Sequence, residues 1–195
     1  ESGWSGVMTL PRIFCLAPDG TLRMEPIPEL QVLRMNPRQL KNLKLAASEE
    51  KPLDAIQGDS LELHVEILPG NAQEIGVKVR CSPDGTEQTE IVYEPAIHKL
   101  KIVMGRSSLD KNIRYSAYRN GNTAALERLP KDKRMVSAQE APLTLHPGEP
   151  LRLRIFLDRS ILEVFANNRQ CITQMIFPTR PDSMQVILFS RGGAA

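Results

Sequence analysis

The spacing of turn-forming residues constrains this fold more than any other feature of the sequence. Apolar and polar residues alternate over 61–67 and 75–81, and further short strand-like runs recur at intervals of about 8–12 residues, separated by Pro, Gly, Asn and Asp. Fifteen prolines and twelve glycines interrupt the chain too often for long helices. The pattern predicts short antiparallel strands joined by tight turns.

Two segments have the sequence signature of a β-hairpin. Residues 75–81 and 87–93 flank the sequence SPDGT, in which the proline presets one turn dihedral and Asp-Gly tolerates positive φ. Near the N-terminus, residues 12–16 and 21–25 flank APDG in the same way. We find no linker composition and no internal repeat. The sequence therefore predicts one all-β domain over residues 1–195, built as an antiparallel two-sheet β-sandwich.

Two stretches depart from the strand pattern. Residues 27–47 place leucines around Pro37, and a short helix before Pro37 fits this segment because a proline ends the helix that precedes it. Residues 105–134 combine turn formers with mixed charge. We expect a long hairpin with irregular loops there.

Charge and hydropathy exclude two classes of partner. The 25 Lys and Arg against 23 Asp and Glu give a formal net charge of +2, without the concentrated basic face that nucleic-acid binding needs. Residues 131–134 are the nearest approach to a basic run, but an aspartate interrupts them and they read as a solvated loop. No apolar run approaches the ~18 residues of a membrane span. We expect neither a nucleic-acid partner nor a membrane partner.

The cysteines and histidines form no recognisable metal or redox motif. Cys15, Cys81 and Cys171 are widely spaced and resemble small buried apolar residues on strands, so a cytoplasmic and a secreted location both stay open. The three histidines are scattered, and we expect no metal and no cofactor. The chain begins with Glu1 and not with methionine, so we expect the natural N-terminus to lie upstream.

The stretch LRIFLDRSILEVFANN, residues 153–168, brings together three residues that suit catalysis. Asp158, Ser160 and Glu163 could supply a general acid, a nucleophile and a base. If a tight turn pairs Asp158 with Ile161, the leucines of both strands face the core and Glu163 lies opposite Phe156. Asp158 and Glu163 then share the outer face as diagonal neighbours, with backbones about 7–8 Å apart. Spacing alone leaves a catalytic pair open.

The surroundings of these residues favour a structural hairpin. Glu163 would lie diagonal to Arg154, and a guanidinium stabilises the ionised carboxylate, which is the wrong state for a general acid. Ser160 has no histidine or lysine nearby in sequence to take its proton. Independent hydrolysis through Asp158 and Glu163 is the minor alternative. The Asn167-Asn168 turn extends the pair into a three-stranded meander.

The same stretch resembles a known family. GEPLRLRIFLDRSILEVFANN, residues 148–168, is similar to the run GEPLxLRIFxDxSxxEVFxN in the C-terminal β-sandwich of glycoside hydrolase family thirty-two, which contains invertases, levanases, inulinases and sucrose-6-phosphate hydrolases. GWSGVMTLPR, residues 3–12, resembles the segment that leaves the catalytic domain, and residues 16–34 and 79–95 continue the likeness. The resemblance implies a jelly-roll, concanavalin-like sandwich, with 1–12 as a lead-in segment.

Two departures from the family pattern limit what the resemblance implies. After the strand IVYEP the family shows LxVDRSRSG, whereas this chain has LKIVMGRSS over 100–108, so Val103 and Met104 replace an Asp-Arg pair. Family members carry their chemistry on an N-terminal five-bladed propeller with the motifs WxNDPNG, RDP and EC, and none of these strings occurs here. We carry over no catalytic residue and expect this chain alone to be inactive.

The resemblance implies a non-catalytic module of a β-fructofuranosidase-type glycosidase that acts on sucrose, levan or inulin. The module would dock on the propeller of the same polypeptide and stabilise it, with homo-oligomer contacts as a further option. Trp4 either anchors the two domains or fills the end of the sandwich's own core. The candidate interface residues are Trp4, Arg12, Arg152, Arg154, Phe156, Asp158 and Glu163.

The alternative function is a carbohydrate-binding, lectin-like module. Sugar sites favour aromatic platforms, yet aromatic residues make up only 5% of this chain. Tyr115 and Tyr118 fall in one loop-rich region and are the candidate sugar-binding residues. Surface tyrosines more often pack against neighbouring side chains, which favours the docking module.

Overall fold

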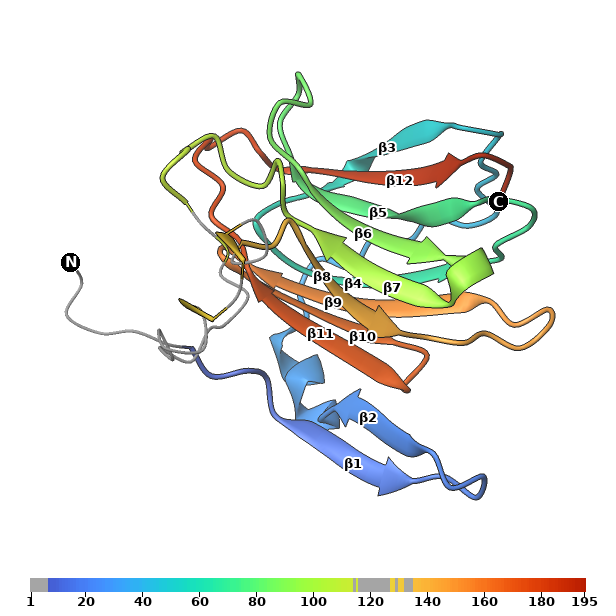
Figure 1. Cartoon of the computed structure of the whole chain (residues 1–195). Helices are drawn as coiled ribbons and strands as arrows, with labels where there is room; N and C mark the ends of the chain where they lie inside the picture. The colour runs from blue at the N-terminus through green and yellow to red at the C-terminus, as the bar shows by residue number, and fades with distance from the viewer. Residues whose placement is uncertain (1–6, 114, 116–126, 129, 132–134) are drawn as a thin grey trace.

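The protein is a β-sandwich of two antiparallel sheets (Figure 1). The computed structural model describes residues 7–113, 115, 127–128, 130–131 and 135–195. One sheet has four strands in the order β11 (Gln170–Met175), β10 (Ile161–Ala166), β9 (Leu151–Asp158) and β4 (Ser60–Ile67). The other has six, in the order β3 (Glu50–Gln57), β12 (Gln185–Arg191), β5 (Glu74–Cys81), β6 (Thr89–Glu94), β7 (Lys99–Val103) and β8 (Ala138–Pro142). The predicted two-sheet sandwich is confirmed.

The core lies between the two sheets and follows the alternation of the sequence. Ile75 and Val77 of β5 face Ile155 of β9 and Leu162 of β10 within one cluster of buried side chains. Successive side chains of a strand point to opposite faces of its sheet, so one set of alternate residues fills the core and the other points outward. Met104, which replaces a polar residue of the family pattern, is 2% exposed and belongs to this core.

The four-stranded sheet has the predicted register. Asp158 pairs with Ile161, and Glu163 lies between Phe156 on β9 and Thr173 on β11. The three-stranded meander over 151–175 is therefore confirmed. β4, which comes from a distant part of the sequence, pairs antiparallel with β9 along its whole length and completes this sheet.

The six-stranded sheet contains the predicted hairpin of residues 75–93 as β5 and β6. A side chain at Gly76 would collide with the carbonyl oxygen of Ile91 and with the ring of Phe189. The ring of Phe189 thus covers the position that a glycine leaves open in the strand. Arg80 has a positive φ of 52°, beside the shift in register between β5 and β12, as expected of a β-bulge.

The N-terminal hairpin forms a third, two-stranded sheet outside the sandwich. β1 (Arg12–Leu16) and β2 (Leu22–Pro26) pair in the predicted register, and the hairpin lies beneath the four-stranded sheet with its tip pointing away (Figure 1). The expected short helix before Pro37 is a 3-10 helix, η1 (Pro28–Leu33). A second 3-10 turn, η2 (Pro95–Ile97), connects β6 to β7.

Some expectations fall outside the described residues or are wrong. Most of the predicted long hairpin of 105–134 lies outside the described residues, as do Trp4 and Tyr118. Cys15 was expected to be buried, but it is exposed, because Arg12 alone in its strand is partly covered by the described residues. Cys81 is buried as expected, and Cys171 is half-buried. None of the helices in the described ranges is long and apolar enough to cross a membrane.

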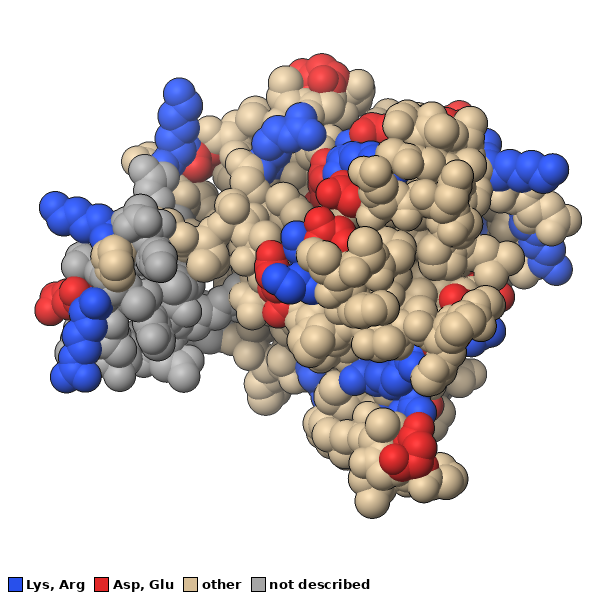
Figure 2. Space-filling view, turned by 45° about the vertical axis from the view of Figure 1, so that its right-hand side comes forward, with Lys and Arg blue, Asp and Glu red and all other residues tan. Residues whose placement is uncertain are grey.

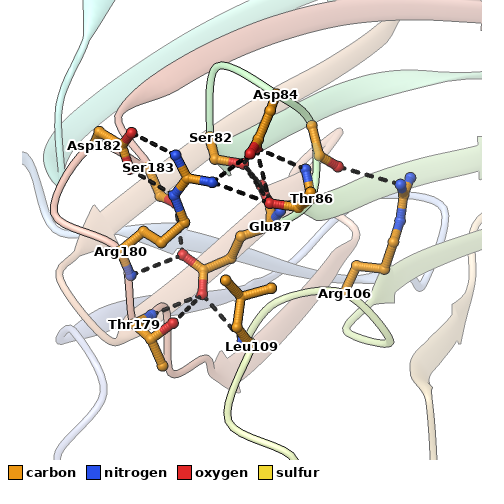
Figure 3. A network of polar contacts seen from close by, with 11 residues as sticks. Ser82, Asp84, Thr86, Glu87, Arg106, Leu109, Thr179, Arg180, Asp182 and Ser183 are labelled. Atoms are coloured by element: carbon orange, nitrogen blue, oxygen red, sulfur yellow. Dashed lines mark hydrogen bonds and ion pairs between the residues drawn. The ribbon is translucent and has the colours of Figure 1, made fainter.

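One end of the sandwich is held together by a buried carboxylate (Figure 3). Glu87 is 0% exposed, and its oxygens accept hydrogen bonds from the N–H groups of Leu109, Thr179 and Arg180 and from the hydroxyl of Ser183. Burial alone would raise the pKa of Glu87, but these hydrogen bonds outweigh it and lower the pKa. Three loops that are far apart in sequence are fixed at this point.

Candidate functional site

The outer face of the four-stranded sheet brings the predicted interface residues together. We call this face the docking face. It carries the outward side chains of β9 and β10, which are Arg152, Arg154, Phe156, Asp158, Ile161, Glu163 and Phe165. Its other contributors are Glu62, His64 and Glu66 of β4 and Cys171 and Thr173 of β11. The N-terminal arm, defined as residues 7–43, lies against it through Arg12 and Arg34.

Glu163 is the centre of the first anchor between the arm and the docking face. Its side chain is 2% exposed. One carboxylate oxygen accepts a hydrogen bond of 2.6 Å from the backbone N–H of Leu10, and the other accepts one of 2.7 Å from Nη2 of Arg12. The Arg12 guanidinium also lies 5.4 Å from the ring centroid of Phe165. Arg12 and Glu163, 151 positions apart, thus form one anchor.

Glu62 forms the second anchor. Arg34 donates to both of its oxygens at 2.7 and 2.8 Å, in the bidentate geometry that suits a guanidinium and a carboxylate. Arg154 and His64 lie 2.7 and 2.8 Å from the same carboxylate. Burial would raise the pKa of Glu62, but the hydrogen bonds from Arg34, His64 and Arg154 lower it to about 2.

Arg34 and Glu62 were missed by the sequence analysis, although part of the signal was present. Glu62 alternates with Leu61 and Leu63, which already indicates an outward carboxylate on β4. Nothing in the sequence indicates that Arg34, 28 positions earlier, reaches it.

The remaining interface candidates lie on the same face and differ in burial. Arg154 stacks over Phe156 at 4.9 Å, and Phe156 meets Phe165 edge-to-face at 6.0 Å between ring centroids. Arg152 pairs with Glu66, but both side chains are more than half exposed. Asp158 is exposed at the end of the strand. Arg154, Phe156 and Phe165 therefore form the centre of the docking face, and Arg152 and Asp158 lie at its rim.

The surroundings of Glu163 suit anchoring better than catalysis. Its carboxylate is buried beneath the arm, and each oxygen already has a donor of this chain within 2.7 Å. Asp158 shares the face but is exposed to solvent, whereas Glu163 is buried, so the two carboxylates lie in different environments. In the same residues, no group of three His, Cys, Asp or Glu side chains is arranged to hold a metal ion. The geometry favours an anchor between two segments of this chain.

The arm itself carries a concentrated apolar surface. Eleven of the fifteen exposed large apolar side chains in the described residues lie within 7–43. Phe14 is 56% exposed, Leu16 73% and Leu22 51%, and all three lie on the face of the hairpin that also carries Arg12. Monomeric proteins rarely leave so much contiguous apolar surface open to water. The overhanging end of the hairpin therefore has the character of an interface.

The candidate sugar-binding residue that the structure describes, Tyr115, takes part in packing. Its ring stacks on Phe177 with centroids 6.2 Å apart, and its hydroxyl lies 2.7 Å from Oγ of Ser107. One face of the ring is thus already in contact with another aromatic side chain. In the space-filling view, most of the visible face carries uncharged side chains, and acidic and basic side chains meet mainly in one cluster near its centre (Figure 2).

The curated proteins that resemble this chain are longer than it is. The chain is 28% identical over 198 residues to a levanase of Bacillus subtilis (strain 168), covering 98% of this chain and 26% of that protein. It is 29% identical over 205 residues to a sucrose-6-phosphate hydrolase of Zymomonas mobilis, covering 100% of this chain and 33% of that protein. The chain thus spans about a quarter to a third of the length of these relatives.

Solved structures share the fold. An exo-inulinase from Aspergillus awamori superimposes with a TM-score of 0.72 at 21% identity, covering 100% of this chain and 35% of the other. Fructan 1-exohydrolase IIa from Cichorium intybus superimposes with a TM-score of 0.75 at 20% identity, covering 96% of this chain and 38% of the other. The family model described as glycosyl hydrolases family 32 C terminal matches residues 29–195, which include every strand of both sandwich sheets. The chain therefore belongs to the C-terminal domain family of the family 32 glycosyl hydrolases.

Proposed function

We propose that this chain is the non-catalytic C-terminal β-sandwich of a glycoside hydrolase that cleaves β-fructosides. In this role it docks on a five-bladed propeller that precedes it in the same polypeptide and stabilises that catalytic domain. The names of its relatives, levanase and sucrose-6-phosphate hydrolase, support β-fructosides as the substrate class. Their greater length supports a further domain in the parent protein.

The observation that carries the proposal is the pairing of two anchors with an uncovered apolar arm. Glu163 and Glu62 fix the arm on the docking face through Arg12 and Arg34. The exposed apolar side chains of the same arm then need a cover, because transferring apolar area out of water is favourable by roughly 25 cal/mol per Å². A domain preceding residue 7 is attached to the arm and is therefore always within reach of it.

A comparison of melting temperatures tests the proposal. The propeller-containing polypeptide should melt at a higher temperature when residues 1–195 are attached than when they are removed. Equal melting temperatures would contradict a stabilising role. Levanase and sucrase activity measured on the two forms should reside in the longer polypeptide, and activity of the isolated 195-residue chain would contradict its non-catalytic assignment.

Within the longer polypeptide, Glu163→Gln should lower the melting temperature of the propeller as well as that of the sandwich. The matched control is Glu66→Gln, which changes an exposed carboxylate of the same face. If both substitutions leave the melting temperature of the propeller unchanged, the anchors stabilise the sandwich and do not stabilise the propeller.

A further inference from the structure

A cavity of about 460 Å³ opens on the outer face of the six-stranded sheet. Glu74 pairs with Arg191 across β5 and β12, while the next residue, Ile75, is fully buried in the core, so both charged side chains point outward. The short helix η2 forms one wall. The lining residues are Gln73, Glu74, Glu94, Ala96, Ile97 and Arg191.

The guanidinium of Arg191 is held in a fixed position in this cavity. Its Nη1 donates to Glu74 at 2.8 Å, and its Nη2 lies 2.9 and 3.0 Å from the two oxygens of Glu90. It also stacks over the ring of Phe189, 4.4 Å from the centroid. A site whose polar groups are already ordered loses little conformational entropy when a ligand binds.

The carboxylates of the cavity are paired but retain acceptor capacity. Glu94 lies 2.6 Å from Nζ of Lys101, and Arg191 is shared between Glu74 and Glu90. An ionised carboxylate can accept about four hydrogen bonds, more than these partners use. Ile97 is 54% exposed and provides an apolar surface beside the polar groups.

We propose that this cavity binds a neutral oligosaccharide. Sugar hydroxyl groups both donate and accept, which matches carboxylates, an amide and a guanidinium arranged around one volume, and the C–H face of a sugar ring suits Ile97. The site is an open depression and not an enclosed cavity, and its volume is within the range of ligand pockets, about 300–1,000 Å³. A phosphorylated sugar is disfavoured because the carboxylates of Glu74 and Glu94 border the cavity.

The cavity and the docking face lie on the outer faces of different sheets, so one can be occupied while the other is covered. A sugar chain held here would keep the protein near a polymeric substrate without taking part in the reaction. Only the choice of β-fructosides as the first probes rests on the proposed function. The inferred sugar class itself rests on the side chains of the cavity.

Titration of the 195-residue chain followed by amide NMR tests the proposal. Inulin-type and levan-type trisaccharides should shift the amide resonances of Gln73, Ala96 and Ile97, with saturation in roughly the millimolar range because no aromatic platform lines the cavity. Absence of saturable shifts would overturn the proposal. Shifts centred elsewhere, for example near Tyr115, would overturn it as well.

Two substitutions and one control locate the site. Glu94→Gln should weaken binding by about tenfold, the scale of one lost hydrogen bond to a charged group. Ile97→Ser changes an exposed side chain and should also weaken binding while the melting temperature stays the same. Glu66→Gln, on the docking face, should have no effect. Equal weakening by Glu66→Gln and Glu94→Gln would contradict the assignment.

A charged probe tests the ligand class. Sucrose 6-phosphate should shift the same amides less than sucrose does at equal concentration, and a larger shift would indicate an anion site instead. These titrations can fail while removal of residues 1–195 still lowers the stability of the propeller. The sugar site and the docking role are therefore tested separately.

Discussion

At the scale of single residues, Glu163 shows how a partner can make a buried charge tolerable. A carboxylate that is removed from water needs a cation and hydrogen-bond donors, and Glu163 obtains them from Arg12 and the Leu10 N–H. Strand alternation placed Glu163 on the outer face correctly and suggested Arg154 as its cationic neighbour. The actual partner, Arg12, comes from the other end of the chain.

The anchor between Arg12 and Glu163 should be measurable in a double-mutant cycle. Arg12→Ala and Glu163→Ala should show a coupling free energy of about 1–3 kcal/mol in urea unfolding, because removal of either partner leaves the other poorly compensated. The exposed pair of Arg152 and Glu66 is the control, with expected coupling below about 1 kcal/mol. Similar coupling free energies in the two pairs would show that the burial of Glu163 does not strengthen its interaction with Arg12.

Glu87→Gln should destabilise the chain by about 1–3 kcal/mol. Both oxygens of Glu87 accept hydrogen bonds from backbone N–H groups, from Thr179 on one side and Arg180 on the other. Either orientation of a glutamine amide therefore brings a donor against a donor. The measurement is the free energy of unfolding in urea.

The control for this variant is Asp84→Asn, at the exposed end of the same network, where Asp84 pairs with Arg180 at 2.6 Å (Figure 3). Asp84→Asn should lower the free energy of unfolding clearly less than Glu87→Gln does, because water can replace the missing contacts. A larger loss for Asp84→Asn than for Glu87→Gln would mean that the surface pair holds the loops.

At the scale of elements, the hairpin of β1 and β2 behaves differently from the strands of the sandwich. A two-stranded hairpin is marginally stable in water unless another structure covers it. Here the end near Arg12 lies on the docking face, whereas Phe14, Leu16 and Leu22 overhang it. The contacts within this chain thus explain the position of the hairpin, and they do not explain its apolar tip.

Replacing Phe14 and Leu16 together by serine should have a small effect in the isolated chain and a large one in the longer polypeptide. In the isolated chain the free energy of unfolding should change by less than about 0.5 kcal/mol, because both side chains are already exposed. In the longer polypeptide the same change should destabilise the contact between domains by about 2–4 kcal/mol, the transfer free energy of two large apolar side chains.

Scanning calorimetry of the isolated chain and of the longer polypeptide provides the comparison. A matched control is Leu68→Ser, which changes a side chain that is 62% exposed and lies outside the arm. If Leu68→Ser lowers the interdomain transition as much as the arm variant, the overhang is not the contact surface.

At the scale of the whole molecule, acidic side chains hold separate parts of the chain together. Glu62 joins the arm to β4 and β9. Glu149 joins the loop before β9 to Arg169 and Asn167, and the hydrogen bonds from His146, Arg169 and Asn167 outweigh the effect of burial and lower its pKa to about 2. The stability of the molecule should therefore depend on pH.

The sign of this dependence follows from the lowered pKa values. The pKa of Glu62 falls from 4.5 to about 2 on folding, so its contribution is fully present above about pH 4.5 and disappears as the pH falls toward 2. The contribution is on the order of 2 kcal/mol once partial exposure is taken into account. Thermal unfolding between pH 7 and pH 2 should show a steep loss of stability below pH 4.5.

Glu62→Gln should be less stable than the native chain at pH 7, and its stability should fall less steeply below pH 4.5, because one of the titrating groups is gone. Glu66→Gln should leave the pH profile unchanged. Parallel profiles for the native chain and Glu62→Gln would show that Glu62 is not responsible for the loss.

Much of the sandwich follows from local rules that the sequence contains. Strand alternation has a period of two, so the buried set of β9 and the outward set that includes Arg154 can be assigned without knowledge of the partner strands. The Asp-Gly turn between β5 and β6 similarly fixes a local hairpin. The pairing of β4 with β9 joins residues about 90 positions apart, and no local pattern specifies it.

The sequence by itself thus determined most of the strands, the inward and outward faces of the meander, and the family to which residues 29–195 belong, but it did not predict β3 and β8. Only the tertiary structure decided that Arg12 and Arg34 meet Glu163 and Glu62, and that the cavity beside Arg191 lies on the outer face of the other sheet. The physical reason is range. Alternation and turns act over a few residues, whereas an ion pair or a cavity depends on how distant segments pack in space.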